Sequence, residues 1–345
     1  MAKEKKLERQ GRLYGRKWKV SIYKNAYAEN GQETAKKLDK DNNIVLDVSM
    51  LRCVFNIQQV SNTPAIMCIL EVYNMNAATE NGVITDGWQI TIEAGYEEGQ
   101  YGEIFKGNIV QVIRNRENGT DYKLEIVALQ GSVQFDVNHV RTSLAAGSKP
   151  RDIPAAIGKN SKKSFAVGEV SENISEQQLP RGKVLFGTPT KYLRDLAVGN
   201  NAYYWAGDDG QLTVKKLEDE IPKDHCIVLA PGSSDKKEPN IGGLVGIPQY
   251  SDEGIKIKML LDSRVKKFSM VKIDNDWIRK QLMQFKPDKG NAEQNSQQSV
   301  FEEDGEYQVI SITHSGDTHG NEWYTDIVGL SRLGMQKQNE KGEKA

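Results

Sequence analysis

Two stretches of the chain carry nearly the same residues. Residues 119–129 read GTDYKLEIVAL and residues 320–330 read GNEWYTDIVGL, with Gly, Ile, Val and Leu recurring without a gap. Just upstream, Gln111–Ile113 returns as Gln308–Ile310, with a longer turn in the second copy. Each copy therefore predicts a strand, a turn ending in Gly and a second strand, which is a β-hairpin. A duplicated β-domain explains the match. The alternative is that hairpins resemble one another because few residue types suit them.

The second strand of each copy indicates which face of the hairpin is covered. Successive side chains of a strand point to opposite faces, so alternate residues share a face. The face predicted to be covered carries Tyr122, Leu124, Ile126 and Ala128 in the first copy and Trp323, Thr325, Ile327 and Gly329 in the second. We expect Trp323 to be largely buried, at the position that Tyr122 takes in the first copy.

Length, charge and cysteine content limit the class of protein. A chain of 345 residues predicts two or three domains, because single cores usually divide at this size. The formal net charge of −1 argues against a general nucleic-acid binder. Cys53, Cys68 and Cys226 are odd in number and lie among apolar residues, which indicates buried free thiols rather than a disulfide framework. The polar N-terminus does not resemble a signal peptide, and the apolar run 65–70 is too short to span a membrane. We expect a soluble protein made in a reducing cytoplasm.

Short strands follow one another over residues 17–133 with no helical pattern between them. After a strand with Trp18, Val20 and Ile22 on one face, strands are expected at 44–48, 52–59, 66–74, 88–94, 105–114 and 122–129. Asn118-Gly119 is a hairpin signal, and Asn81-Gly82 and Asp86-Gly87 are turn or loop signals. This spacing predicts an antiparallel β-sandwich or β-barrel.

Residues 134–218 predict a small α+β middle domain. A short helix is expected near 148–153, with Ser148 as N-cap and Pro150 in the first turn. A second helix is expected over 188–198, because it has an apolar stripe and Gly199 follows it. Strands 202–206 and 211–217 then flank a Gly-Asp-Asp-Gly turn.

Residues 219–332 predict a second β-domain, with strands at 255–261 and 268–273 before the second hairpin. The interval 286–304 is polar and is expected to be a mobile excursion, and 333–345 a flexible tail. Residues 1–16 carry six Lys or Arg against two Glu. They predict a flexible, solvated basic arm, with ordering against an acidic partner as the alternative.

The sequence lacks the spacing of a catalytic or metal site. His314 and His319 are expected in the solvated turn of the second hairpin, too few for a metal site. His225 and Cys226 are adjacent in a strand and so point to opposite faces. The run 203–205, Tyr-Tyr-Trp, could stack a sugar or a base, but packing is the simpler interpretation. We therefore assign no catalytic residues, no cofactor and no metal.

The order of several motifs resembles the baseplate hub proteins of tailed bacteriophages, a family related to the hub portion of type VI secretion spike proteins. The likeness covers about residues 18–332. The motifs that carry it are Leu144–Ser148, Leu179–Leu185, Asp209–Val214, Gly243–Pro248, Asp252 with Gly254-Ile255, Gly305 with Tyr307 and Val309, and His314–Tyr324.

The resemblance implies a mainly β fold in which two tail-tube-like antiparallel β-barrel or sandwich domains are joined by the α+β middle domain. It implies a structural virion protein of the tail baseplate, assembled in the host bacterial cytoplasm as a homotrimeric ring. Three chains with two like modules each would form six similar modules, which adapt a sixfold tail tube to a threefold spike. The expected partners are the tail tube or distal tail protein, the central spike, the tape measure protein and baseplate wedge proteins, with DNA passing through unbound. The alternatives are a tail-associated peptidoglycan hydrolase and a host-surface carbohydrate-binding β-sandwich.

Overall fold

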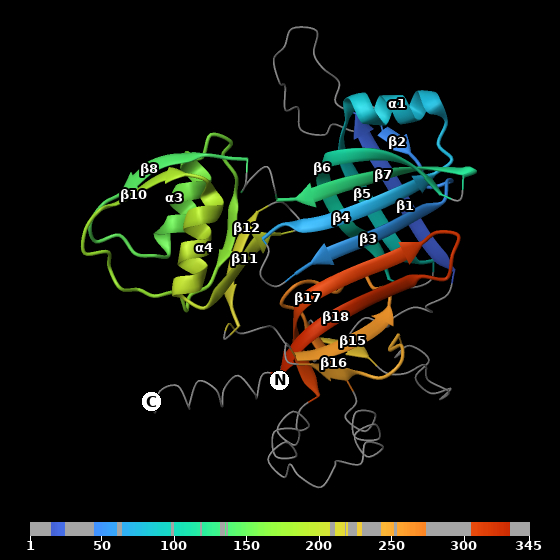
Figure 1. Ribbon diagram of the computed structural model, residues 1–345. Helices are drawn as coiled ribbons and strands as arrows, with labels where there is room; N and C mark the ends of the chain where they lie inside the picture. Colours follow the sequence, from blue (N-terminus) through green and yellow to red (C-terminus); the bar gives the residue numbers. More distant parts are fainter. Residues whose placement is uncertain are drawn as a thin grey trace. The chain divides into compact units, whose positions relative to one another are not determined.

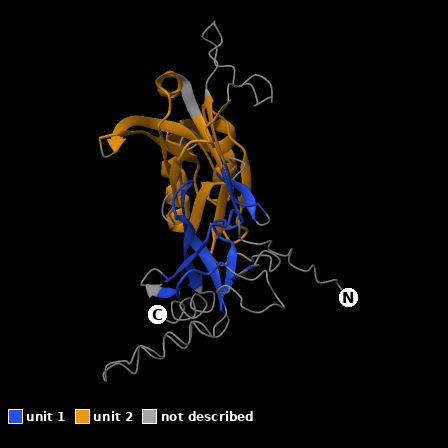
Figure 2. Ribbon diagram, turned by 90° about the vertical axis from the view of Figure 1, so that its right-hand side faces the viewer, with its two compact units in different colours: residues 1–18, 93–104, 221–345 blue, residues 19–92, 105–220 orange. Residues whose placement is uncertain are grey.

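The computed structural model describes residues 15–24, 45–60, 64–97, 100–117, 119–131, 135, 137–207, 211–217, 219, 226–229, 243–251, 254–273 and 305–331 (Figure 1). Two compact units divide the chain (Figure 2): unit 1 takes residues 1–18, 93–104 and 221–345, and unit 2 takes 19–92 and 105–220. Within the described ranges, no helix has the length and apolar content needed to cross a membrane. The architecture is mainly β, as the sequence predicts.

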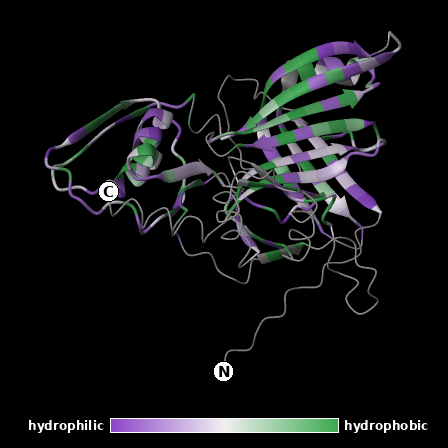
Figure 3. Cartoon of the chain, turned by 60° about the horizontal axis from the view of Figure 1, so that its bottom comes forward, coloured by the Kyte–Doolittle hydropathy of each residue, from purple (hydrophilic) through white to green (hydrophobic). Residues whose placement is uncertain are grey.

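Unit 2 is built on a sheet with the strand order β3-β4-β7-β6-β5-β1-β2, in which residues 16–18 of β1, 93–96 of β5 and 101–104 of β6 belong to unit 1. Its strands are β1 (Arg16–Lys24), β2 (Val45–Asp47), β3 (Cys53–Gln59), β4 (Ile66–Tyr73), β5 (Gly87–Tyr96), β6 (Tyr101–Glu117) and β7 (Asp121–Gln130). Burial alternates along β3, β4 and β7, so one face of the sheet is covered and the other is half-exposed. Figure 3 shows this alternation of hydrophobic and hydrophilic residues along the strands. Cys53 and Cys68 are free thiols on the covered face, as expected.

One helix of unit 2 contradicts the sequence prediction. Helix α1 (Ala77–Asp86) contains Asn81 and Gly82, which were expected to form a turn. The side-chain oxygen of Asn76 accepts a hydrogen bond from the Thr79 amide at 2.8 Å, which caps the first turn of the helix. Val83 is fully buried, but no apolar stripe at helical spacing accompanies it. Tertiary packing overrides the local turn preference of Asn-Gly here.

The α+β part of unit 2 has its own apolar core. It contains β8 (Val140–Leu144), α3 (Asp152–Asn160), β9 (Val167–Val170), β10 (Lys183–Gly187), α4 (Pro189–Gly199), β11 (Ala202–Ala206) and β12 (Leu212–Lys216). Tyr192, Leu193 and Leu196 of α4 are buried, as the predicted stripe requires. The first helix begins at Asp152 rather than at Ser148, because 149–151 form a turn in which the Asp152 carboxylate accepts the Lys149 amide at 2.8 Å. One pair of strands, β9 and β12, runs parallel.

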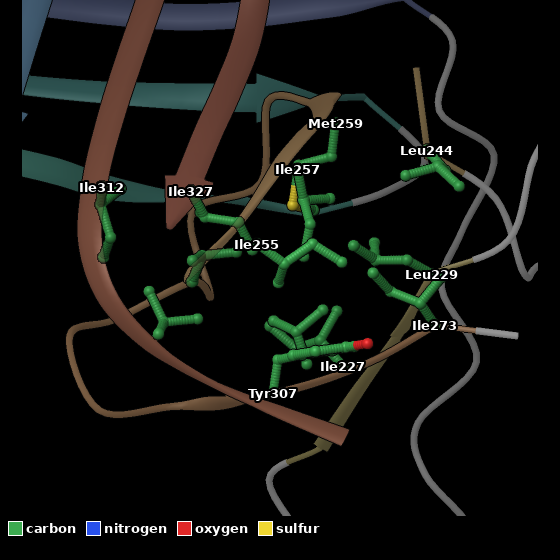
Figure 4. Packing of buried hydrophobic residues seen from close by; sticks show 13 residues of the cluster. Ile227, Leu229, Leu244, Ile255, Ile257, Met259, Ile273, Tyr307, Ile312 and Ile327 are labelled. Carbon is green, nitrogen blue, oxygen red and sulfur yellow. The ribbon is translucent and has the colours of Figure 1, made fainter. Parts of the chain in front are cut away.

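Unit 1 contains the last six strands, in the order β14-β15-β18-β17-β16-β13. They are β13 (Cys226–Leu229), β14 (Gln249–Ser251), β15 (Gly254–Leu260), β16 (Met270–Ile273), β17 (Glu306–Asp317) and β18 (Trp323–Ser331). A core of aliphatic side chains around Tyr307 fills this unit (Figure 4). All described pairs in it are antiparallel except β13 with β16.

The two sheets repeat one strand order. β3-β4-β7-β6-β5-β1 in unit 2 corresponds position by position to β14-β15-β18-β17-β16-β13 in unit 1. The two similar hairpins, β6–β7 and β17–β18, therefore occupy the same place in their sheets, which is what a duplication predicts.

A bulge gives the register of the two hairpins and corrects the sequence alignment. In β6, Val110 is the extra residue, between the pairs Ile109–Ala128 and Gln111–Val127. In β17, Ile310 is the extra residue, between the pairs Val309–Gly329 and Ser311–Val328. Ile310 therefore corresponds to Val110 and not to Ile113. A match of three residues cannot determine a register when the turns differ in length and each strand carries a bulge.

The predicted basic arm, polar excursion 286–304 and C-terminal tail 333–345 lie outside the described residues, except for the last two residues of the arm. Gly15 has a φ of +68°, and Arg16 already belongs to β1.

Candidate functional site

The histidine that sequence reasoning assigned to a solvated turn is buried in a strand. His314 lies in β17, and its Nδ1 is 2.8 Å from the Thr325 hydroxyl oxygen of β18. Burial lowers the pKa of His314 to about 4; nearby Lys266 lowers the pKa further and Asp262 opposes it. The imidazole is therefore neutral at pH 7 and has a structural partner.

His319 does lie in the turn, where it is exposed. Its backbone amide donates to the Asp317 carboxylate at 2.9 Å, and its Nδ1 is 3.0 Å from the Thr318 hydroxyl. Across the described ranges, no three His, Cys, Asp or Glu side chains converge as metal ligands would. His225 lies outside these ranges, and only the backbone of Cys226 is described, paired with Met270.

The aromatic run 203–205 packs within the α+β part. Trp205 is buried, and the Tyr204 ring meets Phe135 edge-to-face with 6.2 Å between centroids. Tyr203 points to the other face of β11 from Tyr204 and is half-buried, which raises the pKa of its hydroxyl. The three rings do not form the flat exposed patch that carbohydrate binding requires.

A polar cleft of about 490 Å³ lies between α1 and the end of the β6–β7 hairpin. The Arg114 guanidinium pairs there with Glu80 and Asn81 of α1. Arg116 lies over the Tyr122 ring, with 4.4 Å between its guanidinium carbon and the ring centroid. Each arginine thus has a partner within the cleft.

Tyr122 itself differs from its expected role. It is 52% exposed, whereas Trp323 at the corresponding position is 1% exposed, as predicted. Leu124, Ile126 and Ala128 are buried as the alternation requires. Both residues lie beside the turn of their hairpin, but Trp323 is covered by other residues of unit 1, among them Trp18.

Arg16 is one of the residues that cover Trp323, and the sequence did not indicate this role. Its guanidinium donates to the backbone carbonyls of Gly320 at 2.6 Å and Asn321 at 3.0 Å, in the β17–β18 turn. It also lies 5.4 Å from the centroid of the Trp323 ring, against which Trp18 packs edge-to-face at 6.1 Å. Arg16 was counted with the flexible arm, but it fixes the start of β1 to the turn of the second hairpin.

Comparisons with known proteins show what kind of fold this is. No protein-family model matches the sequence, and no curated protein matches it either. Among solved structures, a tail protein of Neisseria meningitidis aligns with a TM-score of 0.54 and 10% identity, covering 92% of this chain and 97% of that one. A 43 kDa tail protein of prophage MuSo2 from Shewanella oneidensis aligns with a TM-score of 0.52 and 7% identity, covering 90% and 97%.

The chain has a phage tail-protein fold. The alignments cover almost the whole length of both tail proteins, so the tail-protein fold includes the parts of both units. A component of the type VI secretion system of E. coli also aligns, with a TM-score of 0.48, 10% identity and coverage of 82% of this chain and 74% of that one.

Proposed function

We propose that this chain is a structural baseplate hub of a phage tail, in which three copies form a ring between the tail tube and the central spike. The observation that carries the proposal is the repeated strand order in a chain with a tail-protein fold. Three chains with two like sheets each supply six similar modules. Such a ring matches a sixfold tube on one side and a threefold spike on the other.

The domain division that goes with this function is 17–133 and 219–332 as the two tube-like domains, with 134–218 between them. In this proposal the terminal arms are residues 1–15 and 333–345, because Arg16 belongs to β1. The partners are a second and third copy of the chain, the tail tube or distal tail protein, the spike, the tape measure protein and wedge proteins. The protein acts in the virion tail after assembly in the host cytoplasm, and it has no enzymatic role.

The half-exposed face of each sheet suits the lining of a DNA channel. Two of its lysines form ion pairs: Lys123 Nζ is 2.6 Å from Glu71, and Lys272 Nζ is 3.3 Å from Glu306. Lys258 lies opposite Asp326 in the β15–β18 ladder. A lining with paired cations neutralises few phosphates, so DNA would pass through without being held. We propose that these faces form the channel for ejection.

A reconstruction of the assembled particle by cryo-electron microscopy tests this function. We expect three copies of the chain around the tail axis, between the tube and the spike. A position in a peripheral fibre would refute the proposal, and so would six copies around the axis.

A further inference from the structure

The two-stranded β8–β10 sheet of the α+β part has one covered face and one open face. Val140 of β8 and Leu185 of β10 are buried in the apolar core that also contains residues of α3 and α4. The residues that alternate with them lie on the opposite face of the sheet. This outer face carries, all exposed, Val137, His139, Arg141, Ser143, Val184 and Phe186.

The apolar side chains of the outer face are unusually open to solvent. Val137 is 72% exposed, and Val184 and Phe186 are each 70% exposed. Phe186 lies directly opposite Arg141 in the strand register, and Val184 lies directly opposite Ser143. Apolar side chains that gather on one small sheet with a polar rim are typical of a binding surface, whereas single surface residues are not.

The ionised side chains of the outer face are cations. Lys162 adjoins the face, because its amide donates to the His139 carbonyl at 2.7 Å. In the part of the chain that the structure describes, neither Arg141 nor Lys162 forms an ion pair. Residues 137–217 carry twelve Lys or Arg against seven Asp or Glu, although the whole chain has a net charge of −1. The α+β part therefore attracts an acidic partner.

The backbone beside the outer face argues against a lipid partner. The Phe186 amide donates to the Tyr192 hydroxyl at 2.8 Å, and that hydroxyl donates to the Phe186 carbonyl at 3.0 Å. These groups point away from β8, so the amide and carbonyl of Val184, two residues earlier, point the same way. Among the described strands, none pairs with this edge of β10. Hydrocarbon cannot satisfy such backbone groups, whereas a polypeptide can.

The chemistry of the face also argues against nucleic acid and against a second copy of the same face. Nucleic-acid affinity comes from many cations placed along the phosphates, and this face has only Arg141 and the adjoining Lys162. A symmetric contact between two such faces would bring like charges together, which is unfavourable. An aromatic residue paired with an arginine, without carboxylates, is instead typical of the centre of a protein interface.

We propose that the outer face of the β8–β10 sheet, with Phe186 and Val184 beside Arg141, binds an acidic segment of another tail protein that carries apolar side chains between its carboxylates. The apolar side chains cover Phe186 and Val184, and the carboxylates pair with Arg141 and Lys162. The inference goes beyond the ring of the proposed function, on which it rests only for the tail in which the contact is sought.

Site-specific photo-crosslinking in assembled tails tests the contact. Photoreactive p-benzoylphenylalanine replaces Phe186 in one preparation and Val198 of α4, which is 72% exposed, in a matched control. We expect position 186 to form an adduct with another tail protein, and mass spectrometry should locate it in a segment where Asp and Glu outnumber Lys and Arg. The control should not label that segment. Adducts of position 186 with a second copy of this chain, with DNA or with lipid, or no adduct, would overturn the inference.

A charge reversal supplies an independent readout. R141E is expected to lower the yield of the position-186 adduct by about tenfold, because it removes a cation at the centre of the contact and adds a like charge. R194E, which makes the same change at an exposed position of α4, should leave the yield within about twofold. Replacing the acidic residues of the crosslinked segment by Lys should restore the yield with R141E. An unchanged yield with R141E, or no restoration, would refute the charge pairing.

The two proposals fail separately. If reconstruction shows three copies in a ring while position 186 labels no acidic segment, this surface is wrong and the hub function stands. A peripheral position of the chain would refute the hub function, whereas the acidic adduct and its dependence on Arg141 would still support this surface.

Discussion

We expect the buried neutral state of His314 to make the stability of unit 1 depend on pH between about 6.5 and about 4. The folded-state pKa of about 4 lies below the ordinary value of 6.5, so within this window the unfolded chain binds a proton that the folded chain does not. The free energy of unfolding therefore falls as the pH falls through the window. Below about pH 4, His314 lowers the free energy of unfolding no further.

The magnitude follows from the difference between the two pKa values. At about 1.4 kcal/mol per pKa unit, the whole window corresponds to about 3 kcal/mol, most of which is lost between pH 7.5 and pH 4.5. The charges around the imidazole modify this burial effect: Lys266 disfavours protonation, and Asp262, which pairs with Arg264 at 2.7 Å, favours it.

The assay is urea unfolding followed by tryptophan fluorescence, since Trp18 and Trp323 belong to unit 1. The perturbation is H314N, whose side-chain oxygen can take the hydrogen bond that Nδ1 makes with Thr325. We expect the variant to be less stable at pH 7.5 and to lose about 2–3 kcal/mol less unfolding free energy than the unmodified chain on going to pH 4.5. H319N changes an exposed histidine of the adjacent turn and serves as the matched control. Parallel profiles of unfolding free energy against pH for H314N and the unmodified chain would show that the buried imidazole is not the source of the pH dependence.

Three further outcomes are expected. Trp323→Ala should cost about 3–5 kcal/mol of unfolding free energy, and Tyr122→Ala, at the corresponding exposed position, about 1 kcal/mol or less. Urea unfolding measures both losses. Equal losses would contradict the burial of Trp323 and the exposure of Tyr122. Arg16→Ala should cost about 1–3 kcal/mol of unfolding free energy by removing the donor for the turn carbonyls, while Lys19→Ala, at an exposed position of β1, should stay within about 0.5 kcal/mol. Similar melting temperatures for the two variants would mean that the Arg16 contacts do not stabilise the turn. The purified chain should give no clearing in a peptidoglycan zymogram, and clearing that one Asp, Glu or His substitution abolishes would refute a purely structural role.

The local features of the fold could be predicted from the sequence because they depend on short-range chemistry. Side-chain alternation requires only a strand with one covered face, and it located the strands of both hairpins. Helix α4 was predicted almost to the residue, because Pro189, the apolar stripe and Gly199 are local signals. The burial of Trp323 followed from the same alternation.

The tertiary structure decided what depends on residues distant in the sequence. Whether a residue at a given place on a hairpin is covered depends on what packs against it, so Tyr122 is exposed and Trp323 is not. His314 is buried beside Thr325 of the next strand although its neighbours in the sequence are small and polar. The register of the repeat depends on a bulge, and a bulge is defined by pairing with another strand and not by the residue that forms it. The exposure of Val110 likewise depends on what packs against it and not on its residue type, because the equivalent aliphatic residue Ile310 is buried.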